Sequence, residues 1–136
     1  MLENDISIED ANELYNKGME PIEKGLPSLY PNIIYDDKSP WSVLLDCWKD
    51  AALAGYTQAQ YRYKLYLSTA AQLSNYYNER LKNEVDLIQS LTETLLQKLE
   101  ANTLLEYAGY YFRGNKELGI PQDLKQRITY IKKNCH

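Results

Sequence analysis

The stretch Trp48–Gln60, with the sequence WKDAALAGYTQAQ, predicts the end of one helix and the start of the next. The alanines before Gly55 are small enough for a neighbouring helix to approach closely, and Gly55 can take the left-handed conformation that closes a helix. Thr57 and Gln60 have the spacing of a capping box for the following helix. A hairpin with so short a turn buries one face only, so we expect further helix pairs to pack against it.

Apolar residues recur at helical spacing along most of the chain and predict about six helices. We expect them over residues 7–18, 40–54, 57–69, 81–99, 102–113 and 123–133. Gly18 is interpreted as the end of the first helix, and Asn102 or Thr103 as the start of the fifth. A break near Ser74 and Asn75 rests on polar cap residues alone.

Two further segments flank these helices. From Met19 to Pro40 the density of proline and glycine argues against a helix or a central strand. The loop expected there carries enough apolar side chains to lie against the helices. At the other end, Asp123 is the expected cap of the last helix, whose apolar stripe consists of Leu124, Ile128 and Ile131.

Length and composition set bounds on the class of protein. A chain of 136 residues has the size of one ordinary domain, so we expect a single domain over residues 1–136. A net charge of -4 and the lack of a basic cluster argue against nucleic acid as a partner. No apolar run is long enough for a membrane span. The expected location is cytoplasmic, or periplasmic if a signal peptide has been removed ahead of Met1.

Charge is unevenly distributed along the chain. Acidic residues crowd residues 3–13, and basic residues crowd residues 125–133. Acid in a first turn and base in a last turn both suit the helix dipole, so the simplest interpretation is two solvated helix ends. A head-to-tail contact is the alternative.

The chain carries a weak internal repeat of two helices. Tyr15–Gly18, with the sequence YNKG, matches Tyr111–Gly114, with the sequence YFRG. The apolar positions of Trp41–Lys49 match those of Leu124–Lys132. Paired helices in tandem predict a helical-repeat architecture, in which each pair buries its open face on the next.

These residues resemble the Sel-one-like repeats, relatives of the tetratricopeptide repeats. Gly119–Asp123, with the sequence GIPQD, is similar to the loop within such a repeat, and Trp48–Ala52 followed by Gly55 is similar to its second helix and turn. The resemblance departs from the family at Lys64, where a glycine is usual, and over residues 81–99, which replace a loop and a second helix. It implies an all-α, short, right-handed helical-repeat solenoid of stacked antiparallel helix pairs, about six helices in all.

Catalytic chemistry finds little support in the sequence. The only histidine is His136, and the two cysteines, Cys47 and Cys135, match no metal motif. We predict no catalytic, cofactor-binding or metal-binding residue, and interpret Cys47 as a small buried side chain. Neighbouring acids are usually solvated rather than catalytic. They are Asp36 with Asp37, Glu9 with Asp10 and Glu13, and Glu84 with Asp86.

Binding to another protein is the better-supported class of function. The chain has thirteen tyrosines and one phenylalanine, and Tyr and Arg often dominate the energetics of protein interfaces. Helical repeats bind partners on their concave surface, where we expect a groove. The candidate residues of this groove are Gln58, Arg62, Tyr66, Tyr110 and Arg113. Tyr30 and Tyr35, on the long loop, are the second candidate surface, although tyrosines also fill wide grooves between repeats.

The family resemblance implies an adaptor, and similar short bacterial proteins include immunity proteins that neutralise a secreted toxin. The expected partner is therefore another protein, an effector or a signalling component. Two alternatives stay open. One is a carboxylate-dependent hydrolase, because some members of the family are assigned hydrolytic activity. The other is a self-associating scaffold, a homo-oligomer formed through the last helix.

Overall fold

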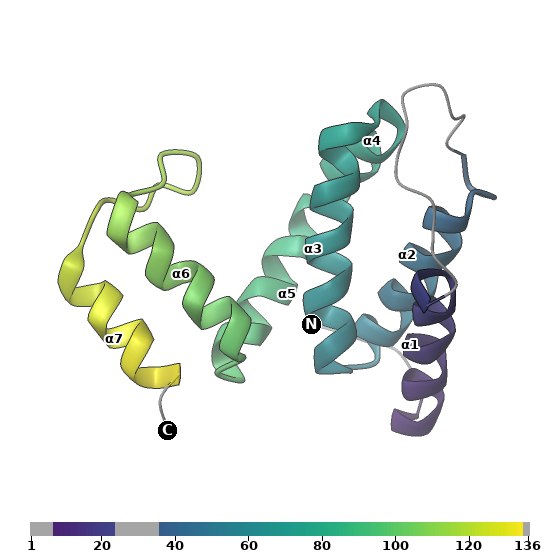
Figure 1. The fold of residues 1–136 in the computed structure, drawn as a ribbon, viewed down its shortest axis with the longest axis horizontal. Helices are drawn as coiled ribbons and strands as arrows, with labels where there is room; N and C mark the ends of the chain where they lie inside the picture. The colour runs from purple at the N-terminus through teal and green to yellow at the C-terminus, as the bar shows by residue number, and fades with distance from the viewer. Residues whose placement is uncertain (1–6, 24–35, 135–136) are drawn as a thin grey trace. The chain divides into compact units, whose positions relative to one another are not determined.

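The computed structural model describes residues 7–23 and 36–134, and these residues form an all-α protein (Figure 1). Within them there are seven helices and no strand, and neighbouring helices pack against one another in a repeat-like chain, as the fold prediction requires. The helices are α1 (Ile8–Glu23), α2 (Pro40–Leu53), α3 (Thr57–Leu73), α4 (Asn75–Asn83), α5 (Val85–Gln97), α6 (Ala101–Arg113) and α7 (Leu124–Asn134).

The chain divides into two compact units, Met1–Leu91 and Thr92–His136. In the first unit α1 packs on α2, α2 on α3, and α3 on α4. In the second unit α6 packs on α7. The prediction of a single domain over residues 1–136 stays a prediction.

Trp48 lies at the centre of the core of the first unit. It is fully buried, together with Leu44 and Leu45 from its own helix and Tyr63 and Leu67 from α3. The periodic apolar residues of α2 and α3 therefore face one another, as their spacing predicts. Burying such large side chains supplies the main free energy of folding for this unit, at about 1.5–3 kcal/mol for each aliphatic one.

The first helix is longer than its sequence suggests. It begins after Ser7, whose hydroxyl accepts a hydrogen bond from the amide of Asp10 at 3.1 Å, and it continues to Glu23. The expectations that Gly18 ends this helix and that a loop begins at Met19 are wrong, and residues 24–35 of that predicted loop lie outside the described residues. Gly18 is buried inside α1, and a Cβ atom there would lie 2.5 Å from Nε1 of Trp48. The glycine is needed because the indole ring occupies the space of a side chain.

The turn between α2 and α3 confirms the predicted role of Gly55. The φ of Gly55 is 94°. The Gly55 amide donates a hydrogen bond to the carbonyl of Ala52 at 3.0 Å, and the Tyr56 amide donates one to the carbonyl of Ala51 at 3.1 Å. These two bonds form a Schellman motif, which satisfies the last carbonyls of α2.

The predicted capping box in the same turn is wrong. The residue that precedes α3 is Tyr56, and its side chain makes no capping hydrogen bond. Gln60 is fully buried, and its Nε2 donates a hydrogen bond of 3.1 Å to the carbonyl of Ala52. The amide therefore satisfies the end of α2 rather than the start of α3, because burial places it against the preceding helix.

The middle of the chain contains one more helix than expected. The break at Ser74 is confirmed, with an extended backbone of φ -146° and ψ 132°, although α3 runs on to Leu73. The single helix expected over residues 81–99 is divided at Glu84, where φ is -114° and ψ is 20°. The amide of Glu84 is shared between the carbonyls of Arg80 and Leu81, at 3.1 Å each. The bond to Leu81 tightens this turn, and the non-helical backbone of Glu84 separates α4 from α5.

In the second unit α6 starts earlier than Asn102. Its cap is Glu100, whose carboxylate accepts hydrogen bonds from the amides of Asn102 and Thr103, at 2.9 Å each. Glutamate is rare at this position, which is why the sequence pattern missed it. The preceding residue, Leu99, has a φ of 56° and reverses the chain after α5.

The loop between α6 and α7 follows the prediction more closely. Gly114 ends α6 with a φ of 74°, and Asp123 caps α7 by accepting hydrogen bonds from the amides of Lys125 and Gln126 at 3.1 and 3.2 Å. The second unit buries Leu95 and Leu104. On α7, however, the side chains of Leu124 and Ile128 are more than half exposed.

Candidate functional site

The predicted partner-binding residues lie in three different places. Gln58, Arg62 and Tyr66 are on α3, in the first unit, and their spacing of four residues puts them on one side of that helix. Tyr110 and Arg113 are at the end of α6, in the second unit. Tyr30 and Tyr35 lie outside the residues that the structure describes. That all five helical residues line one groove stays a prediction.

Arg62 lies over two aromatic rings. Its guanidinium carbon is 6.0 Å from the centre of the Tyr15 ring, on α1, and 5.8 Å from that of the Trp48 ring, on α2. These distances are near the outer limit of a cation–π interaction, so the attraction is modest. Within the described part of the chain, no carboxylate lies within ion-pair distance of this guanidinium. Its N–H donors are thus not committed to an acidic residue.

Tyr66 is largely a packing residue. Its ring contacts Trp48 edge to face, with 4.9 Å between ring centres, and Trp41 at 5.8 Å. It is partly buried and packs against the core of the first unit. Tyr66 therefore holds the Trp48 indole in place under Arg62 and offers a partner only its remaining exposed edge.

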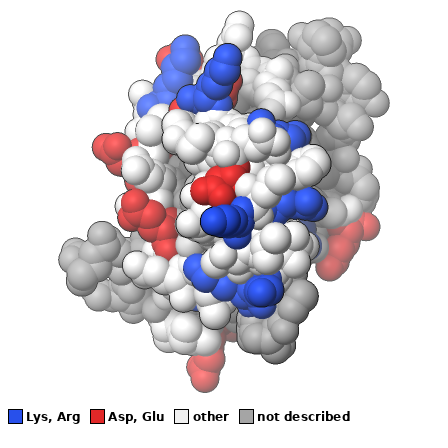
Figure 2. Space-filling view, turned by 90° about the vertical axis from the view of Figure 1, so that its left-hand side faces the viewer, with Lys and Arg blue, Asp and Glu red and all other residues white. Residues whose placement is uncertain are grey.

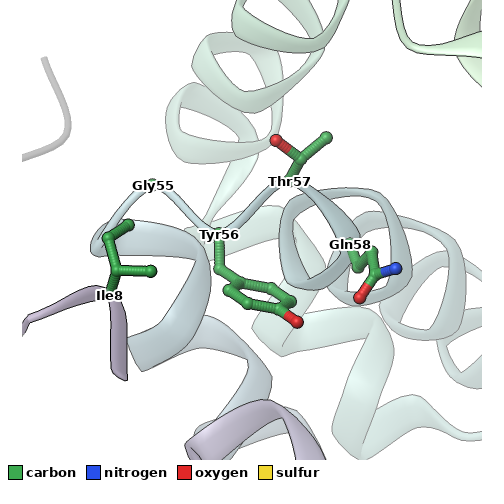
Figure 3. Close-up of a pocket in the computed structure, with 5 residues that line it drawn as sticks. All are labelled: Ile8, Gly55, Tyr56, Thr57 and Gln58. Carbon is green, nitrogen blue, oxygen red and sulfur yellow. The ribbon is translucent and has the colours of Figure 1, made fainter. Parts of the chain in front are cut away.

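An open pocket lies beside these residues, at the turn between α2 and α3. It has a volume of about 320 Å³ and is lined by Ile8 from α1 and by Gly55, Tyr56, Thr57 and Gln58. Figure 3 shows the Tyr56 ring between Ile8 and Gln58. The Tyr56 hydroxyl donates a 2.7 Å hydrogen bond to Oδ1 of Asn12, and Ile8 is 67% exposed.

The pocket and Arg62 belong to one continuous surface. The Tyr15 ring stacks on Tyr56 at 5.1 Å and also lies beneath Arg62, while Gln58 precedes Arg62 by one helical turn. We call this surface the Arg62 face and define it as Ile8, Tyr15, Tyr56, Gln58 and Arg62. It combines an exposed aliphatic side chain, aromatic walls, one amide and one cation without a carboxylate partner, a combination suited to binding a protein segment.

The α1 contribution to the Arg62 face is absent from the sequence prediction. Ile8 and Tyr15 fall within the helix expected over residues 7–18, and Tyr56 lies in the turn after Gly55. Nothing in the sequence places α1 beside the start of α3, because that contact depends on how the helices pack.

Tyr110 and Arg113 lie near the end of α6, in the second unit. The Tyr110 hydroxyl donates to Oε1 of Glu106 at 3.0 Å, and its ring meets Tyr107 edge to face at 5.1 Å. Burial, together with the charge of Glu106, raises the pKa of Tyr110 above its usual range. Arg113 is exposed, and its guanidinium lies across Gly109.

An ionic network, largely buried at Glu84 and Arg80 but exposed at Asp46, joins α2, α3 and α4. Glu84 accepts a hydrogen bond from the Tyr63 hydroxyl and pairs with Lys49, while Nε of Arg80 lies 3.4 Å from its carboxylate. Arg80 also pairs with Asp46 at 2.9 Å. The side chain of Glu84 is only 12% exposed, so the expectation that it is a solvated acid is wrong.

The network fixes the charge state of Glu84. Burial alone would raise the pKa of its carboxyl, but hydrogen bonds from Lys49 and Tyr63 and the charges of Lys49 and Arg80 hold it below the usual range. Burial, with the hydrogen bond to Glu84, raises the pKa of Tyr63. A general acid at neutral pH needs the opposite shift, a raised carboxyl pKa, so we interpret the network as a structural joint between helices.

Cys47 lies in the same unit and is buried, as its interpretation as a small buried side chain requires. Among the described residues, no three His, Cys, Asp or Glu side chains gather as metal ligands would. None of the described helices is both long enough and apolar enough to cross a membrane.

No protein-family model, no curated protein and no solved structure matches the chain. The resemblance to Sel-one-like repeats therefore stays a prediction made from the sequence. The all-α fold class is supported by the seven helices of the described residues.

Proposed function

We propose that this chain is a non-enzymatic protein-binding module and that it engages its partner through the Arg62 face. The observation that carries the proposal is the position of Arg62, held over Tyr15 and Trp48 without a carboxylate partner among the described residues. An arginine in such a setting keeps its planar fork of donors available at little entropic cost. A carboxylate on a partner protein could accept hydrogen bonds from these N–H donors and form an ion pair with Arg62.

The pocket beside Arg62 indicates the rest of the recognition. Ile8 and Tyr56 offer apolar surface, and Gln58 offers both a donor and an acceptor. The partner segment that fits this surface presents an acidic side chain next to an apolar one, so that the carboxylate meets Arg62 while the apolar group enters the pocket. Buried Arg and Tyr contacts of this kind typically carry most of an interface's binding energy.

The experiment is affinity purification with the tagged chain, in cells of its source, using three forms. The wild type should recover a protein that the Arg62→Ala variant loses and that a matched control, Lys82→Ala, retains. Lys82 is also a surface cation, with its side chain 63% exposed on α4, and it pairs with Glu79 on the same helix. Equal recovery by all three forms would contradict the Arg62 face as the binding site.

The finer proposal, that the partner is a secreted toxin and the chain its immunity protein, is supported by the family resemblance alone. It predicts that an adjacent gene encodes an effector and that co-expression of this chain rescues cells from it. The Arg62→Ala variant should rescue less well than Lys82→Ala. An effector that is equally toxic with and without the chain would end this proposal while leaving the binding module intact.

A hydrolase is not proposed. Its strongest candidate residue, Glu84, has a lowered carboxyl pKa and is engaged by Tyr63, Lys49 and Arg80. The composition of the Arg62 face supports binding to another protein rather than hydrolysis.

A further inference from the structure

The outer face of α7 is apolar and exposed. Leu124 and Ile128, which lie one turn apart, are 54% and 52% exposed. The helix packs on α6 through other residues, since Tyr130 stacks on Tyr111 at 5.4 Å and Arg127 lies 4.4 Å from the centre of the Phe112 ring. Aliphatic side chains that stay exposed together on one face of a helix can mark a contact with another molecule.

Basic side chains accompany this apolar stripe. Lys125 and Lys132 share the α7 side of Leu124 and Ile128 by helical spacing, and both are exposed. Neither makes an ion pair within the described part of the chain. In all, α7 carries four Lys or Arg residues and no Asp or Glu. Figure 2 shows Lys and Arg side chains interspersed with uncharged ones and with some Asp and Glu side chains.

A complementary surface is present on α1. This helix carries five acidic residues and one lysine, a net charge of -4, against +4 for α7. Glu9, Glu13 and Glu20 are exposed and fall on one side of α1 by helical spacing. Within the described residues none of these three carboxylates has an ion-pair partner. The aliphatic side chain of Ile8 is exposed beside them.

The spacing of the charges also matches. Lys125 and Lys132 are seven residues apart, and so are Glu13 and Glu20, which places each pair about 10 Å apart along its helix. Two helices packed side by side can therefore form both ion pairs at once, as flanking charges do in coiled coils. A dipole-based role for these charges, at two solvated helix ends, explains their sign but neither the matched spacing nor the exposed aliphatic residues.

We propose that α7 of one copy of this chain packs against α1 of a second copy, head to tail. The surfaces involved differ, so the contact is heterologous, and an open assembly of any length leaves one α1 and one α7 free at its two ends unless a ring closes. The proposal does not rest on Arg62, which has the wrong sign of charge to receive α7, although Ile8 belongs to both surfaces.

The test is the mass of the untagged full-length chain, measured by light scattering and by sedimentation over a range of protein concentrations at low and high salt. We expect the average mass to rise with concentration at low salt and to fall when salt is added, because ion pairs at an exposed interface are screened. A monomer at every concentration, or a mass that does not depend on salt, would overturn the proposal. A contact within one chain would give the monomer result.

Charge reversal identifies the surfaces. Lys125→Glu with Lys132→Glu should weaken association by about tenfold or more, as should Glu13→Lys with Glu20→Lys, because each places like charges opposite one another. Mixing the two variants should restore association, since the reversed α7 then meets a reversed α1 and the unchanged α7 meets an unchanged α1. Failure of the mixture to associate, with both variants folded by circular dichroism, would contradict the α7–α1 pairing. The matched control is Glu79→Lys with Lys82→Glu, on α4, which should associate like the wild type.

If either charge-reversed variant fails to fold, the neutral pairs Lys125→Gln with Lys132→Gln and Glu13→Gln with Glu20→Gln replace them. Each should lower the salt dependence of association. An unchanged salt dependence in both would again overturn the proposal.

Discussion

The indole nitrogen of Trp48 donates a 3.1 Å hydrogen bond to the backbone carbonyl of Tyr15, and the same indole fills the space that Gly18 leaves open one turn later in α1. One tryptophan thereby fixes both the rotation of α1 and its distance from α2. The Tyr15 ring, which this arrangement positions, is part of the Arg62 face. Core packing and the candidate binding surface thus share a residue.

Replacing Gly18 with alanine should destabilise the first unit. The added methyl group meets the Trp48 indole at 2.5 Å, so we expect a loss of about 1–3 kcal/mol in the free energy of unfolding. Urea denaturation measures it. Asn16→Ala, at an exposed position of the same helix, is the control and should unfold within about 0.5 kcal/mol of the wild type. Equal midpoints for the two variants would contradict the close contact.

Replacing Ala52 with leucine tests the packing between α2 and α3. Ala52 is 1% exposed, so the larger side chain should cost about 1–3 kcal/mol of stability by overpacking. Partner binding by the fraction that remains folded should be unchanged, because Ala52 does not belong to the Arg62 face. A titration at a temperature well below the melting point separates the two effects.

Replacing Arg62 with alanine should weaken partner binding and leave stability nearly unchanged. We expect partner affinity to fall by about tenfold or more, as for an interface arginine, with a change in stability below about 1 kcal/mol because the lost cation–π contacts are long. Arg62→Lys should recover little of the affinity, since an ammonium lacks the planar fork. If a thermal melt dropped sharply while binding persisted, Arg62 would be a core residue instead.

The Glu84 network predicts a pH dependence of stability. The folded-state pKa of Glu84 lies below its unfolded value of 4.5, so its ionised form stabilises the fold above about pH 4.5, and this contribution is lost as the pH falls through the folded-state pKa. Glu84→Gln should therefore cost about 2 kcal/mol at pH 7 and converge with the wild type in acid. Urea denaturation at several pH values measures this.

The control for that series is Glu79→Gln, whose side chain is 68% exposed. It should leave the pH dependence of unfolding unchanged. If the free energy of unfolding of Glu84→Gln differed from that of the wild type by the same amount at every pH, the ionised Glu84 carboxylate would not stabilise the folded state.

Cys47 should react slowly with a thiol reagent in the folded protein. It is 8% exposed, and burial raises the pKa of its thiol, which lowers the fraction of reactive thiolate. In a Cys135→Ser background we expect the reaction to speed up by orders of magnitude in denaturant. Rapid labelling of the native protein would contradict the burial of this side chain.

The helical pattern was predictable because it is local. Caps and stripes placed α2, α3 and α7 well, since Pro40, Gly55 and Asp123 act on their immediate neighbours. Two of the errors share one cause. Gly18 and Gln60 looked like a helix end and a cap, yet both serve contacts with α2 that no local rule contains.

The candidate site was predictable in part for the same reason. Gln58 and Arg62 were found because helical periodicity left them outside the core stripe. Tyr15 and Ile8 were not, because they come from a helix some fifty residues earlier in the chain. Glu84 was taken for a solvated acid since its partners, Tyr63 and Lys49, lie on two other helices.

The buried amide of Gln60 gives the α2–α3 hairpin a dynamic property. Its bond to Ala52, together with the two amide bonds of Gly55 and Tyr56, ties the start of α3 to the end of α2 at three points. Segments tied in this way tend to open together, so amide hydrogens of both helices should exchange with solvent at a common rate. Arg62 and Gln58 then stand on a stiff support, and a partner that docks there finds its contact surface already ordered.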